Sequence, residues 1–239
     1  MRIDVISALV KIFSGPLSES IIQRAQDKKI AEIHLHDLRD HAAGNYRHTD
    51  DKPFGGGAGM VLKPEPMFKC INKLLAERKY DEVIYLTPQG KKFNQKRANV
   101  LSLSENIIII CGHYKGIDQR VIDKFVTSEI SIGDYVITGG ETAAIVVIDA
   151  VVRLLPGVLG DSESALTDSF QTDSGFDSPV YTRPAEFEGM KVPEVLLGGN
   201  HKEIADWREE MGRKKYSKVK RSKAKSITTK SITKRKEKN

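Results

Sequence analysis

The sequence predicts an α/β fold built on a parallel sheet that helices cover on both faces. Strand-like segments alternate with segments of helical periodicity through the first two thirds of the 239 residues. Some of the expected strands are apolar on both faces, and residues 106–111 include four consecutive isoleucines. Strands of this kind are typical of a sheet buried between two layers of helices.

Five segments carry strand patterns. We expect strands at residues 2–8, 31–38, 82–86, 106–111 and 126–130. In the second of these, apolar and polar residues alternate, which places Ile33 and Leu35 on one face. Residues 87–90, Thr-Pro-Gln-Gly, are expected to break the third strand, because proline and glycine disfavour continued pairing.

Helical periodicity fills the intervals. We expect helices at residues 17–27, 64–78, 93–103, 117–125 and 141–153. The clearest is residues 64–78, where Phe68, Ile71, Leu74 and Leu75 form an apolar stripe. A long polar loop, residues 39–59, separates it from the preceding strand.

The character of the chain changes after Pro156. Residues 160–179 are rich in Asp, Ser and Gly and are typical of a linker, and residues 194–212 show helical segments around a Gly-Gly-Asn break. We therefore divide the chain into an α/β domain at 1–160, a linker at 161–178, a small helical domain at 179–212 and a tail at 213–239. The low-complexity tail is expected to be disordered when alone.

Charge is concentrated in the tail. Residues 213–239 carry 13 basic side chains and one acid, a net charge of +12, so residues 1–212 carry −6 within the total of +6. Such asymmetry indicates a polyanionic partner, either nucleic acid or an anionic membrane surface. The alternative is a solvated tail that has no partner.

The chain shows no sign of export or membrane insertion. No uncharged apolar run approaches the roughly 20 residues of a membrane span, and the first residues lack a secretory pattern. Cys70 and Cys111 each lie inside an apolar run, which predicts buried thiols in a reducing compartment. We expect a cytoplasmic protein.

Three glycine-containing loops follow predicted strands, at residues 86–90, 112–116 and 132–140. Ligands of open parallel sheets bind at the carboxyl ends of the strands, and glycine lets the backbone approach them closely. The loops therefore predict a nucleotide-like ligand. The chain has neither the dinucleotide-binding glycine fingerprint nor a P-loop, which disfavours dehydrogenases and P-loop enzymes.

Histidines raise the question of a metal site. His34, His36 and His41 lie near Asp37 and Asp40. The first two share a strand face and lack the further Cys or His partners of a closed site, so we expect no metal there.

Seven segments, which follow one another in the family's order along the chain, resemble the bacterial tRNA (guanine-37-N1)-methyltransferase family. They are RHTDDKPFGGGAGMVLKPEP (47–66), YLTPQG (85–90), CGHYKGIDQR (111–120), SIGDYVITGGE (131–141), VVRLLPGVLG (151–160), DSPVYTRP (177–184) and VPEVLLGGNH (192–201). The resemblance covers residues 1 to about 212 and is far more specific than any single motif.

This resemblance implies a SPOUT-type sheet with a deep trefoil knot, plus a small helical C-terminal domain that binds tRNA. It also implies a homodimer whose active sites use both chains. The three loops would hold S-adenosylmethionine. The cofactor residues would be Leu86, Thr87, Pro88, Gly112, Tyr114, Gly116, Ile132, Gly133, Asp134, Tyr135, Val136, Ile137, Gly139 and Gly140.

The family's catalytic pair falls on Asp168 and Arg153. Taken alone, Asp168 would be interpreted as a turn or cap residue, and Arg153 as a surface charge. With the resemblance, a carboxylate can take the proton from guanine N1, and a guanidinium can stabilise the charge that builds on N1 and O6. Asp50, Arg183 and His201 fall at positions expected near the target base or the tRNA.

The chain departs from the family at two positions. Where the family commonly has arginine and then glutamate in its C-G-R-Y-E-G segment, this chain has His113 and Lys115. The glutamate is linked with the family's proposed magnesium requirement. Lysine offers no oxygen ligand, so Mg²⁺ either has no role here or uses other ligands.

Two functions follow as alternatives. The first is a tRNA guanine-N1 methyltransferase. The second is an RNA-binding relative without activity, in which the tail supplies affinity. The presence of both Asp168 and Arg153 favours the enzyme.

Overall fold

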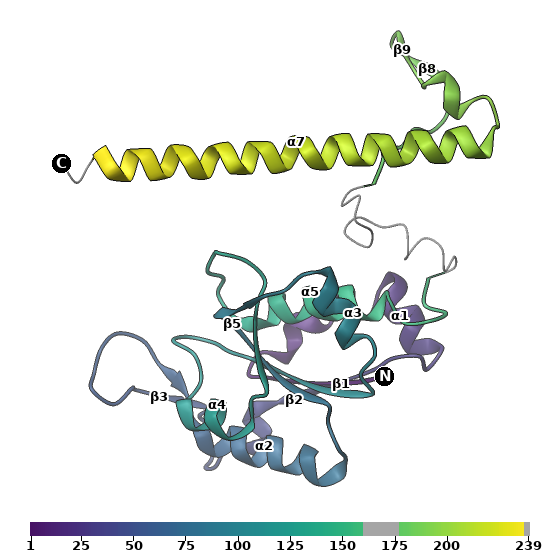
Figure 1. Ribbon diagram of the computed structural model, residues 1–239. Coiled ribbons are helices and arrows are strands. Elements are labelled where there is room, and N and C mark those ends of the chain that lie inside the picture. Colours follow the sequence, from purple (N-terminus) through teal and green to yellow (C-terminus); the bar gives the residue numbers. More distant parts are fainter. Residues whose placement is uncertain (160–176, 237–239) are drawn as a thin grey trace. The chain divides into compact units, whose positions relative to one another are not determined.

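A computed structural model describes residues 1–159 and 177–236 (Figure 1). The chain divides into two compact units, residues 1–162 and 163–239. This division falls close to residue 160, where we placed the end of the α/β domain. Each unit is described by itself below.

The first unit is built on a five-stranded parallel sheet. Its strands are β1 (Arg2–Ser7), β2 (Glu32–Asp37), β5 (Glu82–Lys92), β6 (Asn106–Cys111) and β7 (Ser128–Ser131), in the order β2-β1-β6-β5-β7. All four neighbouring pairs are parallel, with Ile3 opposite Ile33 on one side and Ile107 on the other. The predicted parallel sheet is confirmed.

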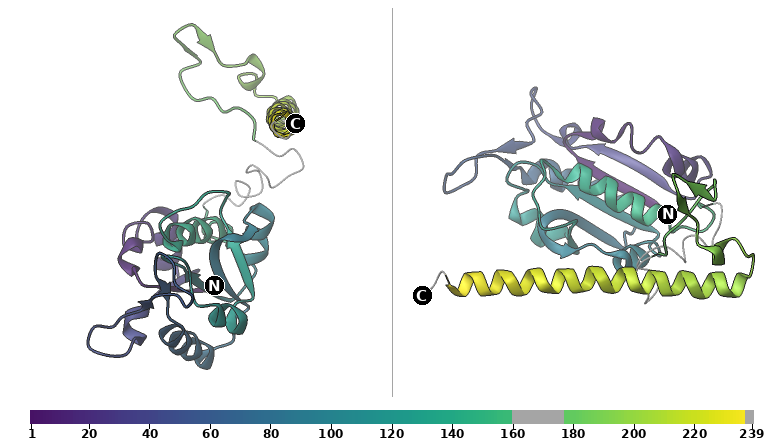
Figure 2. Two further views of the ribbon diagram at one scale, coloured as in Figure 1. Left: turned by 90° about the vertical axis from the view of Figure 1, so that its left-hand side faces the viewer. Right: turned by 90° about the horizontal axis from the view of Figure 1, so that it is seen from above.

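Helices cover both faces of this sheet (Figure 1, Figure 2). The helices α1 (Ser20–Asp27), α3 (Gln95–Leu101) and α5 (Gly140–Val152) cover one face, and α2 (Pro64–Glu77) and α4 (Gln119–Phe125) cover the other. Two short 3-10 helices follow β1 and β2, at Val10–Phe13 and Leu38–His41. Each predicted helix is present, with ends that differ by up to three residues.

The central strand β6 explains why both layers form. Ile107 and Ile109 belong to the apolar cluster under α1, α3 and α5, and Ile108 and Ile110 belong to the cluster under α2 and α4. All four side chains are at most 1% exposed. Because side chains alternate along a strand, a strand that is apolar at every position must be covered on both faces.

In the structure one predicted strand is longer than expected, and two predicted apolar positions are exposed. Leu75, in the predicted stripe of α2, is 41% exposed. In β2, Ile33 packs against the apolar cluster under α1, α3 and α5. Leu35 is 39% exposed, because β2 is an edge strand with a neighbouring strand on one side only. The strand β5 does not end at residue 86. It continues to Lys92 after a shift of register, so that Leu86 and Lys91 both pair with Ile130.

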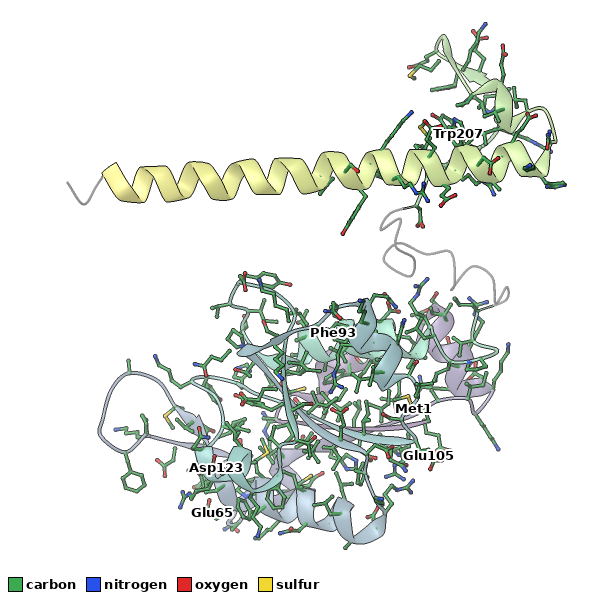
Figure 3. All side chains as sticks on the ribbon, viewed as in Figure 1. Met1, Glu65, Phe93, Glu105, Asp123 and Trp207 are labelled. Carbon is green, nitrogen blue, oxygen red and sulfur yellow. The ribbon has the colours of Figure 1, made fainter. Side chains whose placement is uncertain are left out.

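The predicted buried thiols are confirmed, and the polar loop contains structure. Cys70 and Cys111 are both buried and free. Within the loop, β3 (Asp50–Asp51) pairs antiparallel with β4 (Val61–Leu62). Phe93, which follows β5, packs against the apolar cluster under α1, α3 and α5 (Figure 3).

The second unit contains a hairpin and a long helix. The strands β8 (Glu186–Phe187) and β9 (Met190–Lys191) pair antiparallel, a 3-10 turn covers Glu194–Leu196, and helix α7 spans His201–Lys236. The predicted helix break is present, and Asn200 caps α7, because its side chain accepts from Lys202 N at 3.2 Å and donates to Glu203 Oε1 at 2.8 Å.

Helix α7 continues through residues 213–236, where we expected no regular structure in the tail taken alone. Lysine and arginine have good helix propensity, so the tail can extend a helix that is already nucleated.

At the other end of α7, the Trp207 ring lies 6.5 Å from that of Tyr181 (Figure 3). Within the described residues, no helix has both the length and the apolar content needed to cross a membrane.

Candidate active site

The three glycine-containing segments line one cavity of about 340 Å³. Residues 86–90 lie at the register shift within β5, and the other two segments follow β6 and β7. All the predicted cofactor residues line this cavity except Asp134. Asp134 is exposed and forms an ion pair with Lys92 instead. The loops meet because β6, β5 and β7 are direct neighbours and parallel, so that their carboxyl ends share one edge of the sheet.

Backbone hydrogen bonds hold two of these loops together. Gly140 N donates to Gly112 O at 2.7 Å, and Gly139 forms a bridge with His113. A Cβ on Gly140 would lie 2.9 Å from Cys111 Cα and Gly112 N, so no larger residue fits at the start of α5. A Cβ on Gly112 would lie 2.9 Å from the Tyr85 hydroxyl. The glycines therefore make a cradle of close-packed backbone.

The remaining lining suits a nucleotide-like group. Apolar and aromatic side chains come from Leu86, Ile132, Tyr135, Val136 and Ile137. Polar side chains such as Gln89, Gln119 and Thr138 line the same cavity, so its walls are mixed, and polar groups placed among apolar ones orient a ligand in cofactor sites. The residues present therefore fit S-adenosylmethionine, which combines an adenosine with a charged amino-acid chain.

A buried polar cluster lies beside this cradle. Glu141, in the first turn of α5, is 2% exposed, and its Oε1 accepts a 2.7 Å hydrogen bond from Ser7 Oγ. Its Oε2 lies 3.9 Å from His113 Nδ1, which has no hydrogen-bond partner within the described part of the chain. Sequence reasoning missed this cluster. A signal was present, because Glu141 is the first residue of an otherwise apolar helix pattern.

Cys111 at the end of β6 is not a nucleophile. It is fully buried, and burial raises the pKa of its thiol well above the usual value. The thiol therefore stays protonated, and Cys111 serves as a buried apolar residue of the core.

Asp50 is connected to the cavity through backbone pairing. It lies opposite Leu62 in the β3–β4 pair, and Leu62 N donates to Gly116 O at 3.0 Å. Lys115 N donates to Met60 O at 3.0 Å. The loop at 112–116 therefore contacts the cavity and the strand pair that carries Asp50.

Arg153, Arg183 and His201 are not among the residues that line the cavity. Arg153 follows the last turn of α5, and its backbone N–H bonds Asp149 O at 3.2 Å. A helical rise of 1.5 Å per residue places it about 20 Å along the helix from Gly140. Arg183 and His201 are exposed in the second unit. Asp168 lies outside the described residues.

The cavity offers few ligands to magnesium, because Glu129 is the one carboxylate among the described residues that line it. Mg²⁺ needs oxygen ligands in an octahedron, commonly one or two carboxylates with waters. Lys115 stands where the family's glutamate is expected, and an ammonium offers no lone pair. Within residues 1–159 and 177–236, no group of three or more His, Cys, Asp or Glu side chains could hold a metal ion.

Comparison with known proteins decides the family. The sequence profile of the family described as tRNA (Guanine-1)-methyltransferase TrmD matches residues 1–225. The chain belongs to this family. Residues 226–239, the end of the basic tail, lie beyond the matched region.

Curated relatives with the name tRNA (guanine-N(1)-)-methyltransferase agree with this assignment. The Chlorobaculum tepidum protein is 57% identical over 215 residues, which cover 90% of this chain and 93% of the relative. The Christiangramia forsetii protein is 56% identical over 220 residues, covering 92% and 97%. A Bacteroides fragilis protein is 59% identical over 207 residues, covering 87% and 92%. This member of the TrmD family is therefore a methyltransferase.

Proposed function

We propose that this TrmD-family protein transfers a methyl group from S-adenosylmethionine to N1 of the guanine at position 37 of tRNA, in the cytoplasm. The observation that carries this proposal is the glycine cradle, where three strand-end loops form one cavity in a member of this methyltransferase family. The family name indicates that the methyl acceptor is a guanine of tRNA, and the resemblance described above indicates that this guanine is at position 37.

The chain's own residues would hold the cofactor as follows. The bare backbone of Gly112, Gly139 and Gly140 would let the cofactor approach closely, and the apolar side chains of the loop at 132–137 would cover its base. When bound, S-adenosylmethionine supplies an electrophilic methyl group on a sulfonium. The cavity walls hold the reactants in line, which supplies much of the acceleration in a displacement reaction.

Asp168 and Arg153 would carry the proton and charge chemistry. Guanine N1 is protonated at neutral pH, so a base must remove this proton before N1 becomes nucleophilic. The carboxylate of Asp168 takes the proton as general base. The guanidinium of Arg153 stabilises the negative charge shared by N1 and O6. Asp50, Arg183 and His201 are proposed to contact the target base or the tRNA.

The position of Arg153 supports a homodimer. About 20 Å of helix α5 separate it from Gly140 at the cavity, so one chain does not bring the two together along this helix. A second protomer would supply Arg153 to the cavity of the first. Val146, on α5 between them, is 44% exposed, which supports contact of this helix with a partner.

The trefoil knot is also part of the proposal. Ile130 pairs with both Leu86 and Lys91, so the register between β5 and β7 shifts across residues 87–90. A Cβ on Gly90 would lie 2.5 Å from Ile130 N, so this segment passes tightly against β7. Close crossing of strand-end segments is consistent with a knotted arrangement of these loops.

A direct assay tests the function. Purified protein is incubated with radiolabelled S-adenosylmethionine and with tRNA transcripts that carry G or A at position 37. We expect label in the G37 transcript alone, and nuclease digestion should identify it as 1-methylguanosine. Binding of tRNA without methyl transfer would select the alternative, an RNA-binding relative without activity.

A further inference from the structure

One lysine at the cavity has no counter-ion in the described part of the chain. Lys115 is the only Lys or Arg among the described residues that line the cavity, and its side chain is exposed. No carboxylate of residues 1–159 or 177–236 forms an ion pair with it, whereas nearby Lys92 pairs with Asp134 and Arg97 pairs with Glu82. A cation placed in this way at a binding cavity is available to an anionic ligand.

The stem of Lys115 is held in place. A Cβ on Gly59 would lie 3.0 Å from Lys115 Cγ and 3.3 Å from its Cε, so the stem lies along the bare backbone of Gly59. Gly59 has a φ of +96°, which glycine adopts without strain. The backbone of Lys115 is fixed as well, by its bond to Met60 O. A lysine held in this way loses less rotamer entropy when it binds an anion.

We propose that Lys115 supplies a fixed positive charge at the mouth of the cavity, where it binds an oxyanion of the reactants, and that methyl transfer by this protein needs no divalent metal. The proposal rests on the proposed function above. Its basis is the donor set: among the described residues that line the cavity, Glu129 is the one carboxylate and Lys115 the one ammonium, which repels Mg²⁺. Lys115 takes no part in proton transfer, and the N1 proton still goes to Asp168.

The oxyanion has two possible sources. One is the α-carboxylate of S-adenosylmethionine, and the other is the target nucleotide, through its phosphate or the O6 of the deprotonated guanine. The two share one chemistry, a charge-assisted hydrogen bond from an ammonium to oxygen. Removing one charged hydrogen bond typically costs about tenfold to a hundredfold in affinity or rate.

Metal dependence is tested on the full-length protein by single-turnover methylation of G37 tRNA. One reaction contains Mg²⁺, and the other contains EDTA with cobalt(III) hexammine, which keeps the tRNA folded but has no exchangeable ligand for a protein oxygen. We expect the same rate within about twofold in both conditions. A wild-type rate that collapses without Mg²⁺ would overturn metal independence. Absence of methylation even with Mg²⁺ would count against the proposed function instead.

Two variants test Lys115 itself. Lys115→Met keeps the stem and removes the charge, and Lys69→Met makes the same change on the exposed face of α2, outside the cavity. We expect Lys115→Met to lose about tenfold or more in rate or cofactor affinity, and Lys69→Met to lose neither. Equal behaviour of the two variants would refute a role for Lys115. Lys115→Glu should lose metal-free activity and recover part of it with Mg²⁺.

Calorimetry without tRNA identifies the source of the oxyanion. A weaker dissociation constant for S-adenosylmethionine in Lys115→Met would assign the charge to the cofactor carboxylate. An unchanged dissociation constant together with a slower single-turnover rate would assign it to the target nucleotide. Both results support the proposal, and unchanged values in both measurements would reject it.

Discussion

The hydroxyl of Ser7, at the end of the first strand, donates a 2.7 Å hydrogen bond to the buried carboxylate of Glu141, 134 residues later in the chain. The same hydroxyl accepts from Leu9 N at 2.8 Å. One side chain therefore connects β1, the turn that follows it and the first turn of α5, directly beside the glycine cradle. A carboxylate in a helix's first turn also interacts favourably with the helix dipole.

Ser7→Ala should destabilise the first unit. The change leaves Glu141 Oε1 and Leu9 N without their partner, and an unsatisfied buried polar group costs about 1–3 kcal/mol. Urea denaturation followed by circular dichroism measures the free energy of unfolding. Ser18→Ala, which removes an exposed hydroxyl, is the matched control. Equal stability of the two variants would show that the bond contributes nothing.

Gly140→Val should abolish binding of S-adenosylmethionine. The new Cβ would collide with the backbone of Cys111 and Gly112, and the backbone of the cradle would have to move. Calorimetry gives the affinity, and a thermal melt checks that the variant folds. Gly15→Val is the control, because nothing lies within 4 Å of a Cβ at that glycine. Wild-type affinity in a folded Gly140→Val protein would contradict this placement of the cofactor.

Asp168→Asn should retain cofactor binding and lose at least about 10²-fold in single-turnover methyl transfer, because an amide cannot accept the N1 proton. A rate within a few-fold of wild type would remove Asp168 from the mechanism.

If the glycine cradle of one chain works with Asp168 of the partner, mixing Asp168→Asn with Gly140→Val should restore activity in heterodimers, because one of the two sites then has neither lesion. Subunit exchange is verified by tagging one variant. Lack of recovery after exchange would indicate sites formed within one chain.

Truncation after Gly212 should weaken tRNA binding in a salt-dependent way. It removes a net charge of +12, and the slope of log affinity against log salt falls by about 0.7–0.9 for each phosphate that the protein no longer neutralises. We expect a slope shallower by a few units and an unchanged single-turnover rate at saturating tRNA. An unchanged slope would select a solvated tail without a phosphate partner, and a collapsed rate would mean that the tail positions the target base.

Asp4 should make stability fall in acid. Its side chain is 0% exposed, and burial alone would raise its pKa, but hydrogen bonds from His36 (2.7 Å), Arg2 (2.7 Å) and Tyr80 (2.8 Å) outweigh burial and hold the pKa well below its usual value. A depressed pKa stabilises the fold above the unfolded-state value of about 3.9. This contribution is lost as pH falls below that value toward the folded-state pKa.

The measurement is the free energy of unfolding in urea between pH 3 and pH 7. Wild type should lose stability steeply below about pH 4. Asp4→Asn should be less stable at pH 7 and show a flatter profile. Asp27→Asn, at the exposed end of α1, should keep the steep profile. Parallel profiles for wild type and Asp4→Asn would exclude Asp4 as the source of the acid sensitivity.

The sequence by itself determined the elements whose reasons are local. Residues 106–111 form the predicted strand with the predicted bounds, because a continuous run of β-branched apolar residues is typical of a strand in a sheet that is covered on both faces. The glycines at 112, 139 and 140 predicted the place of the cavity from the sequence alone, because they follow strands whose carboxyl ends share one edge of the sheet.

The tertiary structure decided what depends on neighbours distant in the chain. Leu35 is exposed because its strand lies at the edge of the sheet, which no pattern within residues 31–38 reveals. The bond between Ser7 and Glu141 and the packing of Lys115 on Gly59 join residues far apart in sequence. Periodicity reports which side of an element is buried, whereas the identity of the partner follows only from the path of the chain in space, since burial and hydrogen bonding are set by whatever lies opposite.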